Sequence, residues 1–253
     1  MSTMLSPQNL LPAIGEGANP LDLGGTTGRM GIHANSATKQ FVYGQRLIKP
    51  DGRLFKYCLA TTGGVDGYHA CKSLADDVIG EVLTVAAAIG DTSFEITETG
   101  FTKNQLQGAY VFIYDASGGG QFRYVTGNEA SGTATTVCYV SEPFDQTIAG
   151  TEYCEMFENP YSLCTKTATG KAACIAVPAC TAASGYNFWG QTWGPCVVSP
   201  GETIVPSGDI RQLVFGSNNA VFMEAHGTDY QHAGFVMNYN SDNGPLIMLQ
   251  ISI

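Results

Sequence analysis

Residues 41–59 have the sequence FVYGQRLIKPDGRLFKYCL, and this stretch decides the fold class. Apolar and aromatic residues dominate both of its ends, and the triplet Pro-Asp-Gly at 50–52 lies between them. Proline fixes a backbone angle that suits a turn, and glycine supplies the positive φ that closes one tightly. The stretch therefore predicts a β-hairpin with strands over 41–48 and 53–59.

The rest of the chain also consists of short apolar runs between turn residues. Many short strands at such spacing favour a sandwich or a barrel over an α/β fold, in which helical patterns would alternate with strands. The run at 109–114 is predicted to be a buried strand because it is continuous and rich in aromatic residues. We therefore expect an all-β protein of β-barrel or β-sandwich modules. Further expected strands are 121–125, 135–140, 153–157, 172–177, 186–193, 213–215, 220–223, 235–237 and 246–253.

The composition agrees with this fold class and limits the partners. Only 13% of the residues are charged and 31 are glycine, whereas exposed helices normally need more charged side chains. The formal net charge is −10, and the 12 Lys and Arg residues are scattered. Because phosphate binding needs clustered positive charge, we expect no nucleic-acid partner. No signal peptide and no apolar stretch of about twenty residues is visible, so we expect synthesis in a cytoplasm and no membrane partner.

Residues 1–40 predict an extended N-terminal arm. Pro7, Pro12 and Pro20 interrupt regular structure in this part of the chain. Apolar residues nevertheless recur through it, and a flexible linker would not need them. We expect the arm to become ordered by burying these residues on a neighbouring surface. They are Leu5, Leu10, Leu11, Ile14, Leu21, Leu23, Met30 and Ile32.

No residues are predicted to be catalytic, to ligate a metal or to bind a cofactor. His226, Asp229 and His232 are close in sequence, but this spacing fits no usual metal-ligand pattern. The glycine-rich segment 117–120 lacks the Gly-Lys-Ser/Thr sequence and the helix of a phosphate-binding loop, which favours a β-turn. Serine-hydrolase and zinc-protease motifs do not occur. A cysteine and a histidine that are distant in sequence could still meet in space.

Eight cysteines form neither a CxxC pair nor the Cys/His spacing of a zinc site. Most of them lie inside strand-like apolar runs, which favours buried free thiols over reactive ones. Disulfides stay open as an alternative if the protein meets an oxidising medium. The cysteines are Cys58, Cys71, Cys138, Cys154, Cys164, Cys174, Cys180 and Cys196.

Both tryptophans, Trp189 and Trp193, lie in one apolar run, four residues apart. On a regular extended strand, residues at this spacing share one face. Such a pair could stack a sugar ring, but a core strand or a subunit-interface strand uses indole rings equally well. We favour the core or interface interpretation.

Three segments resemble a family of structural proteins from tailed bacteriophages. Residues 44–57, GQRLIKPDGRLFKY, are similar to the family's hairpin pattern G-x-R-x-x-x-P-D-G-R-x-F-x-Y. Residues 86–93, together with 105–111, are similar to a second pattern. Residues 185–195, GYNFWGQTWGP, are similar to a third. The resemblance covers residues 41 to about 196, in the family's order.

This resemblance implies a capsid decoration (cement) protein on the virion surface. Its partner would be the major capsid protein, whose subunits it would tie together, commonly as a homotrimer. The family pattern also implies a layout in which 41–80 and 159–253 form one β-barrel-like domain and 81–158 form an inserted β module. We expect such a protein to have no enzymatic activity.

Two other functions stay open. A head-fibre or tail-associated protein could bind receptor glycans through a Trp189 and Trp193 face. A cysteine- or metal-dependent hydrolase would need a site assembled from distant residues. A major capsid protein fits less well, because that fold needs a long helix and the sequence has no sustained 3.6-residue pattern.

Overall fold

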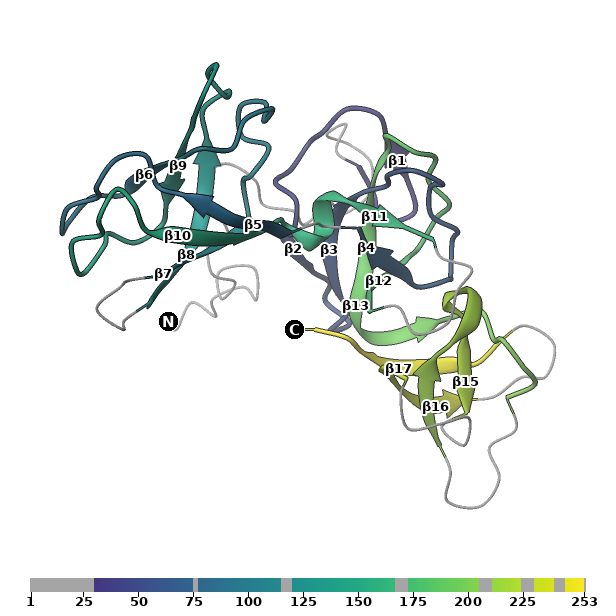
Figure 1. Cartoon of the computed structure of the whole chain (residues 1–253). Helices are drawn as coiled ribbons and strands as arrows, with labels where there is room; N and C mark the ends of the chain where they lie inside the picture. Colours follow the sequence, from purple (N-terminus) through teal and green to yellow (C-terminus); the bar gives the residue numbers. More distant parts are fainter. Residues whose placement is uncertain are drawn as a thin grey trace, which may run out of the picture.

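The structure of the chain is a computed structural model, and it confirms the predicted all-β fold class. Within the part of the chain that the structure describes, seventeen strands form two antiparallel sheets, one of eleven strands and one of six (Figure 1). Two 3-10 helices, η2 (Pro160–Ser162) and η3 (Ser217–Asn219), also occur. The structure describes residues 30–74, 77–114, 120–166, 173–204, 211–223, 230–238 and 244–252.

The larger sheet takes its strands from both ends of the described chain. They are β1 (Asn35–Ser36), β2 (Arg46–Ile48), β3 (Leu54–Leu59), β4 (Cys71–Ser73), β11 (Cys164–Thr165), β12 (Cys174–Pro178), β13 (Asn187–Val197), β14 (Gln212–Phe215), β15 (Val221–Met223), β16 (His232–Asn238) and β17 (Leu246–Gln250). The predicted hairpin is present as β2 and β3. Its turn is closed by a hydrogen bond from Lys49 N to Arg53 O of 2.9 Å, and Gly52 adopts a φ of 84°. Glycine takes this left-handed conformation without the strain that a side chain would add.

Strand β13 is the centre of the larger sheet because its two halves pair with different neighbours. The first half, 187–191, pairs with β3, and the second half, 193–197, pairs with β17. Between the halves, Gln191 and Trp193 lie opposite two consecutive residues of β3, so that Thr192 forms a β-bulge. A bulge inserts one residue into one strand and bends it. The bulge therefore marks the point where β13 passes from one part of the sheet to the other.

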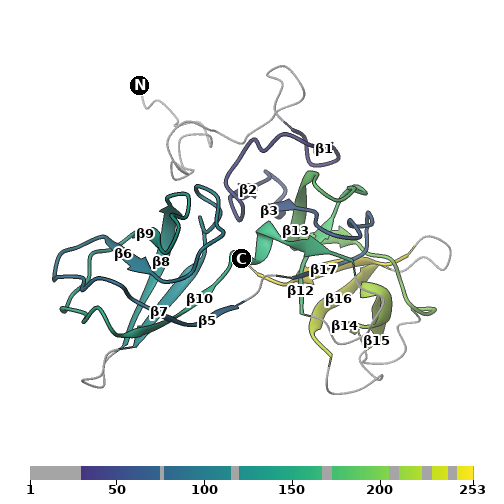
Figure 2. The ribbon, with the colours of Figure 1, turned by 45° about the horizontal axis from the view of Figure 1, so that its top comes forward.

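Residues at the start of the described chain cover one face of β3 and β13. Met30, Ile32 and Phe41 pack against Tyr57 and Trp189 in one buried cluster. Strand β1 pairs with β13, and Figure 2 shows the segment that carries it alongside β2 and β3. Residues 30–40 therefore lie with the larger sheet, whereas the sequence predicted them to be part of the arm. The rest of the predicted arm, 1–29, lies outside the described residues.

The smaller sheet curls into a barrel. Its strands are β5 (Asp77–Val82), β6 (Ser93–Ile96), β7 (Tyr110–Tyr114), β8 (Gly120–Asn128), β9 (Thr136–Val140) and β10 (Tyr153–Phe157). They are ordered β5-β10-β7-β8-β9-β6, and Leu83, next to β5, forms a bridge with Ile96 on β6. A hydrogen bond from Thr84 N to Glu95 O of 2.9 Å extends this contact. The sheet therefore closes on itself around one apolar core.

One buried asparagine joins the barrel to the larger sheet. Asn159 is 4% exposed, and its Nδ2 donates to Tyr43 O (2.9 Å) and to Gln107 O (3.3 Å), one on each side of the junction. A Cβ atom on Gly108 would overlap the Asn159 amide, so glycine is needed there. The barrel strands lie within 77–157, which compares with 81–158 for the predicted inserted module. The division into domains stays a prediction.

Candidate functional site

The outer surface of the barrel carries a face of exposed aromatic side chains. Alternate residues of β7, β8 and β10 point inward, where Val111, Val125 and Met156 are fully buried in the core. The residues between them point outward, and most are aromatic. We call the following seven side chains the aromatic face: Tyr110, Phe112, Tyr114, Phe122, Tyr124, Tyr153 and Phe157.

The register of three adjacent strands brings these side chains together. Tyr110 on β7 lies opposite Tyr124 on β8 and opposite Phe157 on β10, and Phe112 lies opposite Phe122. The rings of Tyr110 and Phe122 stack, with centroids 5.3 Å apart and planes 2° from parallel. The ring of Tyr124 meets Tyr110 edge to face at 5.5 Å. The aromatic face is therefore a continuous packed surface and not a scatter of separate rings.

A glycine makes room for this packing. Gly120 on β8 lies opposite Tyr114, and a Cβ atom at Gly120 would overlap the ring of Phe112. The Phe112 ring therefore lies across the glycine, and Tyr114 packs edge to face against it at 4.8 Å. Glycine normally weakens a strand, and coverage by an aromatic ring offsets that cost. Side chains ordered in this way lose little further entropy when a partner binds.

The aromatic face is open to solvent, and the acidic residue Glu155 lies within it. Phe122 is 55% exposed and Tyr153 is 56% exposed. Glu155 lies on β10 between Tyr153 and Phe157, and a hydrogen bond to its carboxylate raises the pKa of Tyr114. Exposed apolar patches usually mark interaction sites, and aromatic residues are enriched in the cores of protein interfaces. The aromatic face is therefore suited to contact with another macromolecule.

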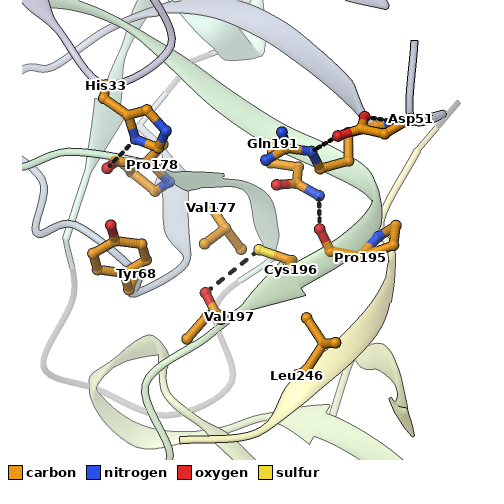
Figure 3. A pocket seen from close by; sticks show the side chains of 12 residues that line it. His33, Asp51, Tyr68, Val177, Pro178, Gln191, Pro195, Cys196, Val197 and Leu246 are labelled. Atoms are coloured by element: carbon orange, nitrogen blue, oxygen red, sulfur yellow. Dashed lines mark hydrogen bonds and ion pairs between the residues drawn. The ribbon is translucent and has the colours of Figure 1, made fainter. Parts of the chain in front are cut away.

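A pocket of about 430 Å³ lies on the larger sheet, beside β12 and β13 (Figure 3). Val177, Val197 and Leu246 contribute apolar surface to it, and Figure 3 shows Leu246 on the opposite side from Tyr68. Volumes of about 300–1,000 Å³ are typical of small-ligand sites. The pocket is thus large enough for a small molecule or for two or three side chains of a peptide.

The polar groups of the pocket are held in place. Nε of Arg53 donates to Oδ2 of Asp51 at 2.8 Å. Nδ1 of His33 lies 3.5 Å from a backbone carbonyl oxygen. The side-chain amide of Gln191, which is 4% exposed, donates to the carbonyl oxygens of residues 193–195 at 2.9–3.2 Å. These contacts fix the backbone that follows the bulge, which forms one wall of the pocket.

Tyr68 stands at the exposed edge of the pocket in a backbone conformation that is rare for a residue with a side chain. Its φ is 65°, and its side chain is 48% exposed. Its N donates to Pro178 O at 2.8 Å, and its carbonyl oxygen accepts from Ser199 N at 2.7 Å. Such conformations cost on the order of 1 kcal/mol or more and are concentrated at binding sites. The strain supports a binding role for the pocket.

A cysteine and a histidine, the residue types that a cysteine hydrolase uses, both line the pocket. Cys196 and His33 both line it (Figure 3), but Sγ of Cys196 donates to Val197 O at 3.5 Å. Desolvation by burial raises the pKa of Cys196 to about 12, although Arg53 opposes this rise. A cysteine nucleophile needs a lowered pKa and a hydrogen-bonded base. This pair therefore lacks the arrangement of an activated nucleophile.

Trp189 and Trp193 do not share a face, contrary to the prediction. Trp189 lies opposite Tyr57, and Trp193 lies opposite Leu54, two β3 residues that point to opposite sides. The bulge at Thr192 causes this reversal, because one extra residue changes the alternation of side chains. Trp189 is 1% exposed and belongs to the core, whereas Trp193 is half-buried. The two indole rings do not form a joint sugar-binding surface.

The other polar candidates are only partly described. His226, Asp229 and residues 117–119 lie outside the described residues. His232 lies on β16, where its Nε2 is 3.2 Å from Oε1 of Gln250. Within the described ranges, no group of three or more His, Cys, Asp or Glu side chains is arranged to hold a metal ion.

All eight cysteines are free thiols, as the sequence favoured, and seven of them are buried. Only Cys180 is partly exposed. Cys164 forms side-chain hydrogen bonds with Cys58 and Cys71 in the core of the larger sheet. Desolvation by burial raises the pKa of Cys164 well above its ordinary value, and the neighbouring thiols raise it further. These thiols therefore behave as small apolar core groups.

The sequence prediction missed the aromatic face. It treated 109–114 as a buried strand, but only the inward residues of this run, such as Val111 and Ile113, are buried. Tyr110 and Tyr114 are 41% and 42% exposed. The signal that could have revealed the face is the two-residue period of aromatic residues in 110–114, repeated at 122–124.

No helix of the described ranges is long and apolar enough to cross a membrane. The aromatic face on the barrel and the pocket on the larger sheet are two candidate binding surfaces among the described residues. Comparison of the chain with protein-family models, with curated proteins and with solved structures found no match.

Proposed function

We propose that this chain is a capsid decoration protein of a tailed bacteriophage, and that it binds the outer capsid lattice through the aromatic face. The aromatic face is the observation that carries the proposal. A protein that adds to a preformed lattice needs a rigid and exposed contact surface, and rigid partners bind with little loss of backbone entropy. The closed barrel supplies this rigidity, because its outward rings are fixed by register and by mutual packing.

The size and chemistry of the aromatic face suit a protein partner. Six of the seven side chains, all but the more buried Phe112, are exposed and offer on the order of 100 Å² each, or roughly 600 Å² together. A standard protein interface buries about 800 Å² on each partner. Tyrosine is among the residues that contribute most to binding free energy, and the hydroxyl groups of Tyr110, Tyr124 and Tyr153 can donate hydrogen bonds at the rim.

Segments of the phage-family resemblance also occupy related places in the structure. Residues 44–57 contain β2 and β3, and residues 185–195 contain most of β13. Strand β3 pairs directly with β13, so two of the three similar segments form one structural unit. Residues 105–111 lead into β7, which carries part of the aromatic face. The proposal is therefore supported by where these segments lie in the fold as well as by their order in the sequence.

The proposed mechanism is stabilisation by preferential binding. A protein that binds the expanded capsid lattice more tightly than the immature lattice shifts the equilibrium toward the expanded state. Several copies joined as a trimer would add avidity, because the second and third contacts become intramolecular. The major capsid protein is the proposed partner, and the virion surface is the proposed location.

A capsid sedimentation assay tests the proposal. Purified capsids of the phage that encodes the chain would be mixed with the protein, and the bound fraction would be measured after centrifugation. Replacing one central interface aromatic costs about 2 kcal/mol, which is roughly a 30-fold loss of affinity. We expect at least this loss for Phe122→Ser, and a larger loss when Tyr153→Ser is added.

Ile89→Ser is the matched control. Ile89 is 66% exposed on the same barrel, in the turn before Gly90, and it is not part of the aromatic face. This variant should bind capsids as the unmodified protein does. Absence of capsid binding by the unmodified protein, or equal binding by the Phe122 and Ile89 variants, would refute the proposal.

A further inference from the structure

The aromatic face lies on the most acidic part of the chain. Residues 77–157 contain eleven Asp and Glu residues but only two Lys and Arg residues, which gives them a formal charge of −9. The rest of the chain has eleven acidic and ten basic residues, so it carries only −1 of the total charge of −10. A surface with such an excess of one sign attracts partners of the opposite sign and speeds their encounter. The charge of the barrel therefore favours a basic partner.

Both basic side chains of the barrel are engaged away from the aromatic face. Nζ of Lys103 lies 3.1 Å from Oε2 of Glu129. Arg123 belongs to the set of β8 residues that alternates with the exposed rings, and its side chain is only 12% exposed. One terminal nitrogen of Arg123 donates to Oε1 of Gln121 at 2.8 Å and lies 3.5 Å from Oδ2 of Asp145. The barrel therefore neutralises two of its carboxylates and supplies no cation to its own exposed rings.

Aromatic rings beside the larger sheet, by contrast, already have cations of their own. Three Lys or Arg side chains lie over such rings, with 4.3–5.6 Å between the charged group and the ring centroid. A cation within about 6 Å of a centroid is attracted by the electron-rich face of the ring. The pairs are Lys39 with Tyr43, Arg53 with Phe55, and Lys56 with Tyr161. Among the described residues, no such pair involves a ring of the aromatic face, so a partner can supply the cations there.

Glu155 places a counter-ion for such a cation within the aromatic face. It lies opposite Phe112 on β7, which in turn lies opposite Phe122 on β8. The carboxylate accepts a hydrogen bond from the hydroxyl group of Tyr114, which uses one of about four acceptor positions and leaves the negative charge in place. Within the described ranges, no basic side chain pairs with it. The charge of Glu155 is therefore available to a cation that stacks on the neighbouring rings.

We infer that the aromatic face binds a basic protein surface that places arginine side chains on its rings, with Glu155 as their counter-ion. Arginine is favoured over lysine, because its planar guanidinium stacks on aromatic rings, is weakly hydrated and can donate two parallel hydrogen bonds to a carboxylate. The inference rests on the proposed function in taking the aromatic face as the contact surface, and it adds the chemistry of the partner. On a capsid, the arginine side chains would belong to the outer surface of the lattice.

Binding of model peptides to the full chain tests the inference without capsids. Two end-blocked peptides of equal charge serve as probes, one with arginines separated by glycines and one with lysines at the same positions. Fluorescence anisotropy of the labelled peptides gives their dissociation constants. We expect the arginine peptide to bind the unmodified protein roughly fivefold more tightly than the lysine peptide. Glu155→Gln should weaken binding of the arginine peptide by roughly fivefold as well, because it removes the counter-ion.

Glu95→Gln is the matched control. Glu95 points outward from β6, which is separated from β7 by two strands, and its Oε1 accepts from Oγ1 of Thr84 at 2.9 Å. Glutamine can keep this hydrogen bond, so the variant removes one charge from the barrel at a distance from the aromatic face. It should change the affinity for the arginine peptide by less than twofold. Equal losses in the Glu155 and Glu95 variants, or equal affinities for the two peptides, would overturn the inference.

Capsid sedimentation of the same variants separates the inference from the proposed function. Glu155→Gln should weaken capsid binding roughly fivefold, and added salt should weaken capsid binding by the unmodified protein. Capsid binding that is lost in Phe122→Ser but unchanged in Glu155→Gln would overturn the inference and leave the proposed function in place. A protein that prefers the arginine peptide through Glu155 but does not bind capsids would refute the proposed function and support the inference.

Discussion

The two sheets carry aromatic clusters of similar packing but opposite exposure. On the larger sheet, the rings of Tyr57 and Trp189 lie 5.1 Å apart, and both residues are almost fully buried. On the barrel, the rings of Tyr110 and Phe122 lie 5.3 Å apart, and both residues are exposed. The difference is the segment that carries β1, which covers the first cluster. An aromatic sheet face therefore becomes core only where another segment covers it.

Aromatic residues therefore serve two purposes in this chain: those of the larger sheet stabilise the fold, and those of the barrel surface are exposed for a partner. Buried rings of the larger sheet contribute to the free energy of folding, because they are removed from water when the chain folds. Most rings of the aromatic face remain about half exposed to water, so the burial of their exposed area is left for a partner. Substitutions in the first cluster should affect stability, and those in the second should affect binding.

The largest effect is expected when the covered cluster is disrupted. Trp189→Ala should lower the free energy of unfolding by about 3–5 kcal/mol, because it removes a fully buried indole and leaves a cavity. Urea unfolding followed by circular dichroism measures this change. Trp193→Ala, at the half-buried position on the opposite side of β13, should cost clearly less. Equal costs for the two variants would contradict the assignment of the two faces.

The second largest effect on stability is expected at the junction between the barrel and the larger sheet. Asn159→Ala should lower the free energy of unfolding by about 2 kcal/mol, since it leaves two backbone carbonyl oxygens without their donor. Gln107→Ala is the control, because it keeps the backbone carbonyl that Asn159 contacts. The control should change the free energy of unfolding by no more than about 0.5 kcal/mol. A neutral Asn159 variant would show that the junction does not depend on this side chain.

Local signals made the fold class and the first hairpin predictable. The Pro-Asp-Gly triplet at 50–52 acts through the backbone preferences of its own residues, so its turn can be recognised without knowing the rest of the structure. The same is true of the alternation between short apolar runs and turn residues. These features are sufficient for an all-β prediction, and the structure agrees with it.

Pairing between distant strands could not be predicted in the same way. The bulge at Thr192 depends on how β13 meets β3, a strand more than a hundred residues away. A shift of one residue exchanges the faces of a strand, so the relation between Trp189 and Trp193 follows from this pairing and not from their spacing. Whether another segment covers an aromatic run also depends on distant parts of the chain. The run 109–114 does not itself reveal this, and it was therefore predicted to be buried on both faces.

A smaller effect on folding is expected when the uncovered cluster is changed. Phe122→Ser should alter the free energy of unfolding by no more than about 0.5–1 kcal/mol, because its ring is 55% exposed. The variant should at the same time show the loss of capsid binding described above. Urea unfolding checks the first expectation. A loss of 3 kcal/mol or more would mean that the exposed rings support the fold as the covered ones do.

The smallest effect concerns Glu155, the acidic residue between Tyr153 and Phe157 on β10. The hydrogen bond between Tyr114 and Glu155 favours the neutral phenol and raises the pKa of Tyr114. Its stabilising contribution is thus present below the ordinary tyrosine pKa and is lost as the pH rises through the raised value. Glu155→Gln should move the pKa of Tyr114 back toward its ordinary value, which NMR titration of ¹³C-labelled tyrosine would measure. Glu152→Gln should leave that titration unchanged, and an equal response to both substitutions would indicate a general charge effect in place of this hydrogen bond.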